Sequence, residues 1–154
     1  MNSKTRTALT AGVLAVALGL GVTAQAASAG TPRSVSGKTN DNITRIADFY
    51  GAYIDAVFDE DSGNLGTALR NHYLTPGFQK ELKAWEEKEH ANGVLRAQNV
   101  PLAWKVTESG TTRSYTEAVV TFTWGMSRPS KVVVDMTRDS HKIFHIGEKG
   151  IGGK

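Results

Sequence analysis

The side chains that could do chemistry in this chain are few, and the familiar catalytic arrangements are missing from its sequence. The 154 residues include no cysteine, which removes thiol catalysis. There is no zinc-protease HExxH pattern, no GxSxG nucleophile elbow and no phosphate-binding loop. The chemistry that remains is proton transfer by one carboxylate, Asp135 or Asp55, beside Tyr50 or Tyr53.

The potential metal ligands do not follow a metal-binding pattern. Residues 59–70 resemble a calcium loop in their first positions, but the twelfth position, which needs glutamate, is Arg70. His141 and His145 would stand about 13 Å apart along an extended strand, too far to share one ion. We therefore predict no metal, no cofactor and no catalytic residue.

Asp135 is the carboxylate best placed to have an altered pKa, because Val134 and Met136 flank it on a predicted strand. Side chains alternate between the two faces of a strand. Val132, Val134 and Met136 share the inner phase, so alternation predicts that Asp135 points to the opposite face, toward solvent.

Five large aromatic residues fall on the apolar phases of the predicted helices and strands, and core packing is their favoured role. The alternative is a lined pocket, since several tyrosine and tryptophan rings at the mouth of a sheet could bind an apolar ligand. Together with Asp135, the candidate binding residues are Tyr50, Tyr53, Trp85, Trp104 and Trp124.

Hydrophobic periodicity divides the chain into a helical half and a strand half. Apolar residues recur every three or four positions and predict helices over residues 43–58, 65–74 and 76–88. Alternation predicts strands over residues 102–107, 115–124, 131–137 and 142–146, with turns at Ser109-Gly110 and over residues 126–130. The pattern indicates an α+β domain over residues 43–147, in which three N-terminal helices pack on a curved four-stranded antiparallel sheet. A flexible leader (30–42) and a flexible tail (148–154) flank it.

The N-terminus has the layout of a secretory signal peptide over residues 1–29. Lys4 and Arg6 precede an apolar run at residues 8–22, which is shorter than a membrane-spanning helix requires, and small residues follow it. We expect a secreted, extracellular protein without a membrane anchor. Cleavage before Gly30 or Ala27 removes both basic residues and lowers the net charge from +3 to +1. Nucleic acid is therefore not an expected partner.

Two segments resemble a family of uncharacterised exported bacterial proteins. One is Phe49-Tyr50-Gly51-Ala52-Tyr53, and the other runs from Asn92 to Trp104. Asn92 and Asn99 stand where that family has aspartates, so a carboxylate chemistry of relatives would be lost here. The resemblance implies the cone-shaped α+β fold called cystatin-like or nuclear transport factor two-like. That superfamily hosts isomerases, cyclases and many binders, so the fold does not determine the function.

These observations favour a secreted, non-enzymatic binding or interaction protein. Its expected partner is an unknown small apolar ligand or an extracellular protein, and a homodimer through the sheet is a further option. Two alternatives stay open. One is a small pocket enzyme of isomerase or cyclase type that uses one buried carboxylate. The other is a proteinaceous inhibitor of an extracellular hydrolase, presented on the turn over residues 126–130.

Overall fold

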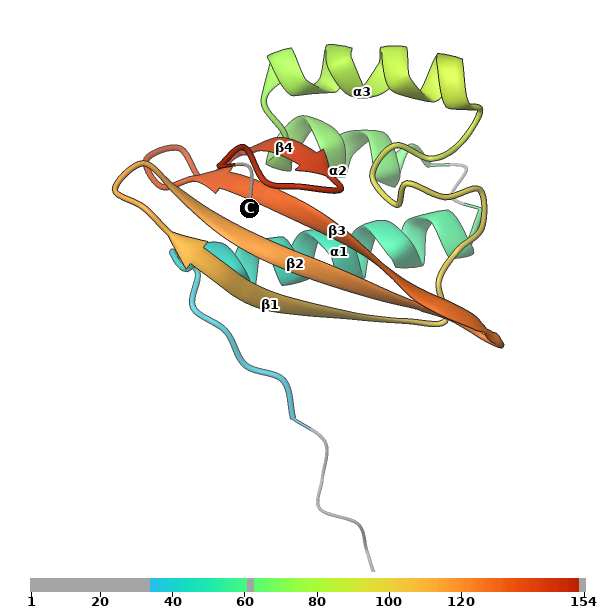
Figure 1. Ribbon diagram of the computed structural model, residues 1–154, viewed down its shortest axis with the longest axis horizontal. Helices are drawn as coiled ribbons and strands as arrows, with labels where there is room; N and C mark the ends of the chain where they lie inside the picture. Colours follow the sequence, from blue (N-terminus) through green and yellow to red (C-terminus); the bar gives the residue numbers. More distant parts are fainter. Residues whose placement is uncertain (1–33, 61–62, 153–154) are drawn as a thin grey trace, which may run out of the picture. The chain divides into compact units, whose positions relative to one another are not determined.

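The computed structural model describes residues 34–60 and 63–152 (Figure 1). Apart from Ser34, these residues belong to one compact unit. The predicted signal peptide lies outside the described residues, as do positions 30–33 of the predicted leader and 153–154 of the predicted tail. Within the described ranges, three helices precede four antiparallel strands, so the α+β class is confirmed.

The helices begin at the capping signals in the sequence. Helix α1 (Asn42–Phe58) starts after Asp41, whose carboxylate accepts a hydrogen bond of 2.8 Å from the Thr44 backbone N–H. Helix α2 spans Leu65–Tyr73. Helix α3 (Pro76–Glu89) follows Thr75, whose hydroxyl accepts from the Phe78 N–H at 3.3 Å. Pro76 occupies the first helical position, where its missing donor is not needed.

The four strands form one sheet in the order β1-β2-β3-β4, and every neighbouring pair is antiparallel. Their bounds are Ala103–Thr111 for β1, Tyr115–Trp124 for β2, Ser127–Thr137 for β3 and Ile143–Gly147 for β4. At one edge, Leu74 forms a parallel bridge with Ile143, and the Thr75 N–H donates to the Ile143 carbonyl at 2.9 Å. Among the described residues, no strand pairs with the other edge, which is β1.

The first predicted turn was wrong, and the second agrees with the structure only at Met126. Ser109 and Gly110 lie inside β1, where the register shifts between Glu108 and Gly110 in a β-bulge. A small residue followed by glycine fits a bulge as well as a turn, and the sequence does not distinguish the two. The second turn is at Gly125 and Met126, and β3 already begins at Ser127. Gly125 has a φ of +44°, which a tight turn between strands requires and which glycine adopts without strain.

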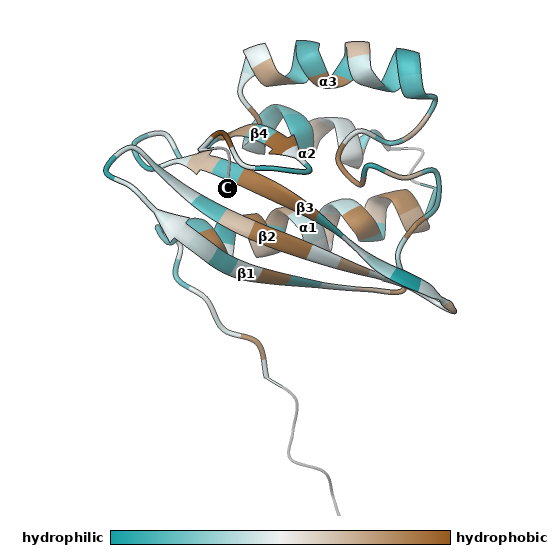
Figure 2. Cartoon of the chain, in the orientation of Figure 1, coloured by the Kyte–Doolittle hydropathy of each residue, from teal (hydrophilic) through white to brown (hydrophobic). Residues whose placement is uncertain are grey.

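The core lies between α1 and the face of the sheet that we call the inner face. Hydrophobic residues follow α1 and the middle of β2 and β3 (Figure 2). The rings of Phe49 and Tyr50 meet edge to face at 5.3 Å, and Tyr50 lies 5.7 Å from Phe122 of β2. Alternate residues of β2 are buried, as period two predicts. We call the opposite side of the sheet the outer face.

Candidate functional site

Three exposed apolar side chains, Phe58, Leu102 and Trp104, border a hollow where α1 meets the free edge strand β1. This hollow of about 600 Å³ is bordered by residues of α1 and by the chain that leads into β1. We call it the Trp104 groove, and its lining residues are Ile54, Asp55, Phe58, Val100, Pro101, Leu102, Ala103 and Trp104. A second hollow of about 590 Å³ lies on the other side of Trp104, between residues 35–48 and Lys105.

The position of the Trp104 ring depends on Gly51 of the facing helix α1. A Cβ atom at Gly51 would lie 3.0 Å from Cζ2 of the Trp104 ring, so the ring packs against bare helix backbone. Glycine inside a helix destabilises it by about 0.5–1 kcal/mol, and this close packing explains its presence. The residue Trp104 remains 37% exposed, and Phe58 and Leu102, which line the same hollow, are 71% and 76% exposed. Trp104 is therefore a surface residue of the groove, so core packing, the role favoured by the sequence, is wrong for this residue.

Tyr53 belongs to a polar network that joins all three helices. Arg70 of α2 donates from Nη2 to the Tyr53 hydroxyl at 2.7 Å and forms a bidentate pair with Glu86 of α3 at 2.5 and 3.0 Å. The Gly93 N–H donates to Glu86 at 2.7 Å, and Asn92 Nδ2 donates to the Tyr53 hydroxyl at 2.9 Å. Each of these polar groups is satisfied within the network, which indicates a structural role.

Burial opposes the charge of Glu86, but the hydrogen bonds from Arg70 and Gly93 outweigh it and hold the pKa of this carboxyl below its usual range. Glu86 therefore stays ionised at neutral pH. A general base that works near neutrality needs a pKa raised toward that pH, so Glu86 does not suit this role.

Tyr50 and Trp85 are connected through Arg96. Tyr50 is fully buried, and its hydroxyl donates to the Val94 carbonyl at 3.3 Å. Burial raises the pKa of Tyr50 far above its ordinary value, although the nearby charge of Arg96 opposes the shift. The Arg96 guanidinium lies 4.2 Å from the centre of the Trp85 ring and donates to the Ile146 carbonyl. Tyr50 thus remains protonated, and Trp85 packs as a half-buried cation–π partner.

Trp124 lies near the end of β2, at the margin of the core. Its indole Nε1 donates to the Ser130 hydroxyl at 2.8 Å, and its ring lies 5.7 Å from Phe122. The five aromatic residues singled out by the sequence therefore do not meet in one pocket. Of these five, Trp104 is the one that borders the Trp104 groove.

Asp135 is fully buried, so the prediction that it faces solvent was wrong. Alternation does direct its side chain to the outer face, but the residues after β4 fold back over this part of the sheet. The Asp135 carboxylate lies 2.8 Å from His145 Nδ1 and accepts from the Ile151 N–H at 3.2 Å. A Cβ at Gly150 would lie 2.0 Å from Glu117, the neighbour of Asp135 on β2, which shows how closely this segment packs.

Burial raises the pKa of Asp135, while the hydrogen bonds from Ile151 and His145 oppose the shift. Its second oxygen, Oδ1, has no hydrogen-bond partner among the described residues. The carboxyl lies on the opposite face of the sheet from Tyr50 and Tyr53, since those tyrosines belong to the inner core. Asp135 cannot therefore act as a base beside either tyrosine.

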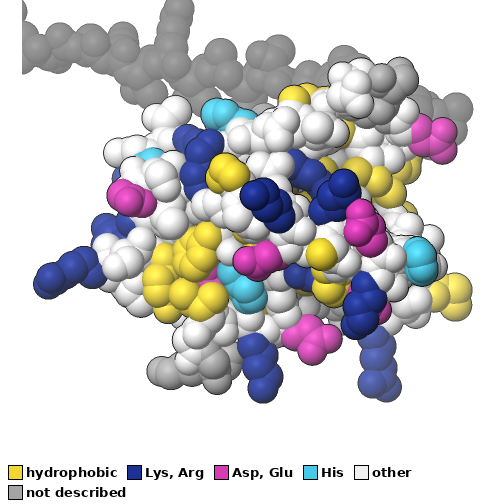
Figure 3. Space-filling view, turned by 90° about the horizontal axis from the view of Figure 1, so that it is seen from above, with side chains coloured by type: hydrophobic (Ala, Val, Ile, Leu, Met, Phe, Trp, Pro, Cys, Tyr) yellow, Lys and Arg dark blue, Asp and Glu magenta, His cyan; other side chains and the backbone are white. Residues whose placement is uncertain are grey.

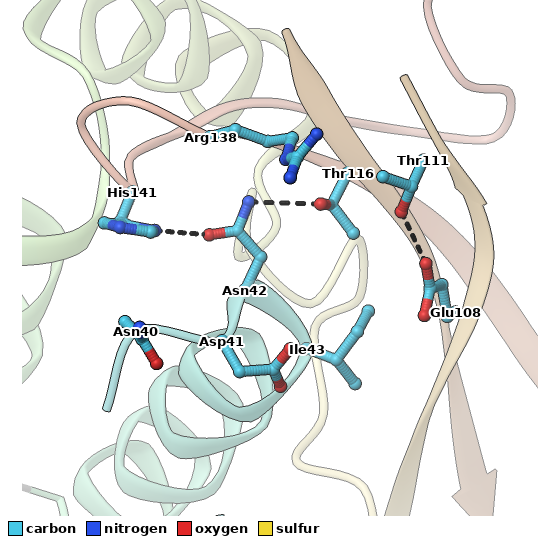
Figure 4. Close-up of a pocket in the computed structure, with 9 residues that line it drawn as sticks. All are labelled: Asn40, Asp41, Asn42, Ile43, Glu108, Thr111, Thr116, Arg138 and His141. Carbon is cyan, nitrogen blue, oxygen red and sulfur yellow. Dashed lines mark hydrogen bonds between the residues drawn. The ribbon is translucent and has the colours of Figure 1, made fainter. Parts of the chain in front are cut away.

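A smaller polar cavity of about 290 Å³ lies at the start of α1 (Figure 4). Asn42 organises it, because its Nδ2 donates to Thr116 Oγ1 at 3.2 Å and to the Thr137 carbonyl at 3.1 Å. Its Oδ1 lies 2.6 Å from His141 Nδ1. Arg138, above them in Figure 4, donates to the Thr112 carbonyl at 3.1 Å. The hydrogen bonds of Asn42 connect α1 to the sheet, so these polar groups of the cavity have a structural role.

Three further observations concern the described residues as a whole. Over residues 34–60 and 63–152, histidine, aspartate and glutamate form no group of three or more that could hold a metal ion. On the surface seen in Figure 3, basic and acidic side chains are interspersed and do not form one basic patch. No helix in the described part of the chain combines the length and hydrophobicity that a membrane span requires.

Comparison with known proteins supports the fold and leaves the family open. No protein-family model matches the chain, and no curated protein matches it. The chain is similar to the crystal structure of a protein of unknown function from Bacteroides thetaiotaomicron VPI-5482, at 21% identity and a TM-score of 0.53. The match covers 68% of this chain and 87% of that one. At this identity, the similarity shows a shared α+β fold alone.

Sequence reasoning missed three residues of the groove. Gly51 looked like an ordinary part of an aromatic motif, although glycine in the middle of a helix is a signal of close packing. Phe58 continues the apolar period of the predicted helix over residues 43–58, but it is the last residue of α1 and is 71% exposed. Leu102 was counted as the first strand residue, whereas β1 begins at Ala103.

Proposed function

We propose that this chain is a non-enzymatic binding protein that holds a small apolar ligand in the Trp104 groove. The observation that carries the proposal is the exposure of Phe58, Leu102 and Trp104 around one hollow of about 600 Å³. Removing apolar surface from water is favourable by about 25 cal/mol per Å². A ligand that covers these three side chains therefore gains this free energy on binding. The volume of the hollow also falls within the range of about 300–1,000 Å³ that is typical of ligand pockets.

The chemistry around the groove supports binding over catalysis. Asp55 is the single titratable residue of its lining, and acid–base catalysis commonly employs a positioned pair of groups. The alternative enzyme of isomerase or cyclase type would need a carboxylate beside Tyr50 or Tyr53. Asp135 lies on the other face of the sheet, and the Tyr53 hydroxyl is already occupied by Arg70 and Asn92.

The proposal includes export and a cone-shaped fold of the nuclear transport factor two-like kind. Export is supported by the apolar run at residues 8–22 behind Lys4 and Arg6. The cone is supported by the order of elements, three helices and then a four-stranded meander, with α1 packed on the inner face. The parallel bridge between Leu74 and Ile143 draws the helical half toward the last strand.

A second candidate function, inhibition of an extracellular hydrolase, is favoured by one observation at the β2–β3 turn. Met126 is fully exposed at the tip of this hairpin, where a protruding side chain could enter the cleft of a protease. Purified protein tested against a panel of secreted proteases would show inhibition that Met126→Ala removes. Absence of inhibition across the panel would leave the groove as the proposed site.

The binding proposal is tested with 1-octanol as a defined apolar probe. The protein has three tryptophans, so a ¹⁵N-labelled sample gives three indole N–H signals, and Trp104→Phe identifies the signal of Trp104. We expect octanol to shift this signal in a saturable way. Phe58→Ala and Leu102→Ala should each weaken binding, whereas Leu65→Ala, which truncates an exposed leucine on α2, should not. Equal shifts of all three indoles, or equal affinities of all variants, would contradict the proposal.

A further inference from the structure

We propose that the ligand of the Trp104 groove is an apolar amine, whose cationic group pairs with Asp55 while its apolar part lies against Trp104. This inference rests on the proposed function and adds the charge of the ligand to it. It depends on the composition of the groove, on two of its polar groups that have no partner among the described residues and on a contrast with the neighbouring hollow.

Asp55 introduces a single negative charge into a lining that is otherwise apolar. Its side chain is exposed, and it makes no ion pair or side-chain hydrogen bond with the described residues. No lysine or arginine borders this hollow. A cation brought by a ligand would therefore find no competing positive group inside the groove, whereas an anion would be repelled.

Trp104 offers the second half of the recognition. Asp55 follows Gly51 by four residues, so it lies one helical turn from the point where the Trp104 ring packs on α1. The Trp104 indole Nε1 has no hydrogen-bond partner among the described residues, in contrast to Trp124, which donates to Ser130. A cation held by Asp55 can approach the Trp104 ring, and an aromatic face attracts cations. Arg96 and Trp85 of this same chain show that contact at 4.2 Å.

The hollow on the other side of Trp104 does not combine a carboxylate with an absence of basic residues. It also contains one carboxylate, that of Asp48, but Lys38 and Lys105 line it as well. A positive group is thus already present there. The two carboxylates lie on the same helix, on either side of Gly51, and differ in the presence of these lysines. Asp48 is accordingly a matched control for Asp55.

The test compares three probes with the same eight-carbon chain: octylammonium, 1-octanol and octanoate. Each is titrated at pH 7 and low ionic strength below its aggregation limit, and binding is followed by the Trp104 indole signal. We expect octylammonium to bind about five- to tenfold more tightly than octanol, and octanoate to bind most weakly. Asp55→Asn should reduce the octylammonium affinity about fivefold without changing that of octanol, and Asp48→Asn should change neither.

The two proposals fail in different ways in this experiment. If octanol and octylammonium both leave the Trp104 signal unmoved, the proposed function is wrong. If octanol binds at Trp104 but octylammonium binds no better, the groove is apolar without charge selection and the inference about the amine is wrong. Equal effects of Asp55→Asn and Asp48→Asn would also overturn it, because they would assign the preference to the general charge of the protein.

Discussion

Replacement of Glu86 by glutamine should destabilise this protein more than any other single-charge change on α3. Glu86 accepts two hydrogen bonds from Arg70 and one from the Gly93 N–H. Glutamine keeps one acceptor oxygen, but its amide NH₂ would face the guanidinium, where both groups are donors. Arg70 would then be left half-buried without a counter-charge.

The size of the effect follows from the burial of the pair. The side chains of Arg70 and Glu86 are 22% and 23% exposed. Breaking a fully buried pair costs about 3–5 kcal/mol, and an exposed pair contributes about 0–1 kcal/mol. With water reaching about a quarter of each side chain, we expect Glu86→Gln to lower the free energy of unfolding by about 2 kcal/mol.

The adjacent residue supplies the control. Glu87 is on the same helix, 68% exposed, and its partner Lys83 is 3.9 Å away. Glu87→Gln changes the net charge equally and should alter stability by less than about 0.5 kcal/mol. Urea denaturation at pH 7, followed by circular dichroism, gives both values. A double-mutant cycle of Glu86→Gln with Arg70→Gln should show a coupling free energy of about 1–2 kcal/mol.

The pair of Arg70 and Glu86 also predicts how the free energy of unfolding changes with pH. Because the folded pKa of Glu86 is held below its unfolded value, its contribution is present above about pH 4 and is lost as the pH falls through the folded pKa. The difference between the native protein and Glu86→Gln should therefore shrink in acid. Equal stabilities of Glu86→Gln and Glu87→Gln at pH 7, or a difference that does not shrink in acid, would refute this reasoning.

Three further predictions concern other parts of the chain. Gly93→Ala places a Cβ 2.8 Å from Leu82 in the core and should lower the urea midpoint by an amount equivalent to about 1–3 kcal/mol; an unchanged midpoint would mean that the loop moves freely. The folded pKa of Asp135 is raised by burial, so its contribution is fully present below the unfolded pKa and is lost as the pH rises through the folded pKa. In Asp135→Asn this loss of stability with rising pH should be smaller than in the native protein, and urea midpoints measured between pH 3 and pH 7 test this expectation. Mass spectrometry of the culture supernatant should find a chain that begins at Gly30 or Ala27, and an intact N-terminus in a membrane fraction would contradict export.

Local signals in the sequence were sufficient for the elements. Asp41 and Thr75-Pro76 are capping signals that act within one helical turn, so the starts of α1 and α3 agree with the prediction to within a residue. The alternation of apolar and polar residues along β2 indicates which face is buried, because successive side chains point to opposite faces of the sheet. Turn positions were less accurate, since Ser109-Gly110 fits a bulge and a turn equally well.

The candidate site depended on contacts between residues far apart in the chain, and these contacts are not encoded in any local pattern. Asp135 is buried because Ile151, sixteen residues later, returns over the outer face, a path that the period of β3 cannot reveal. Trp104 stays at the surface because Gly51 allows its ring to pack on α1 at the open edge of the sheet. Periodicity determines which face of an element is apolar, and only the tertiary structure decides what covers that face.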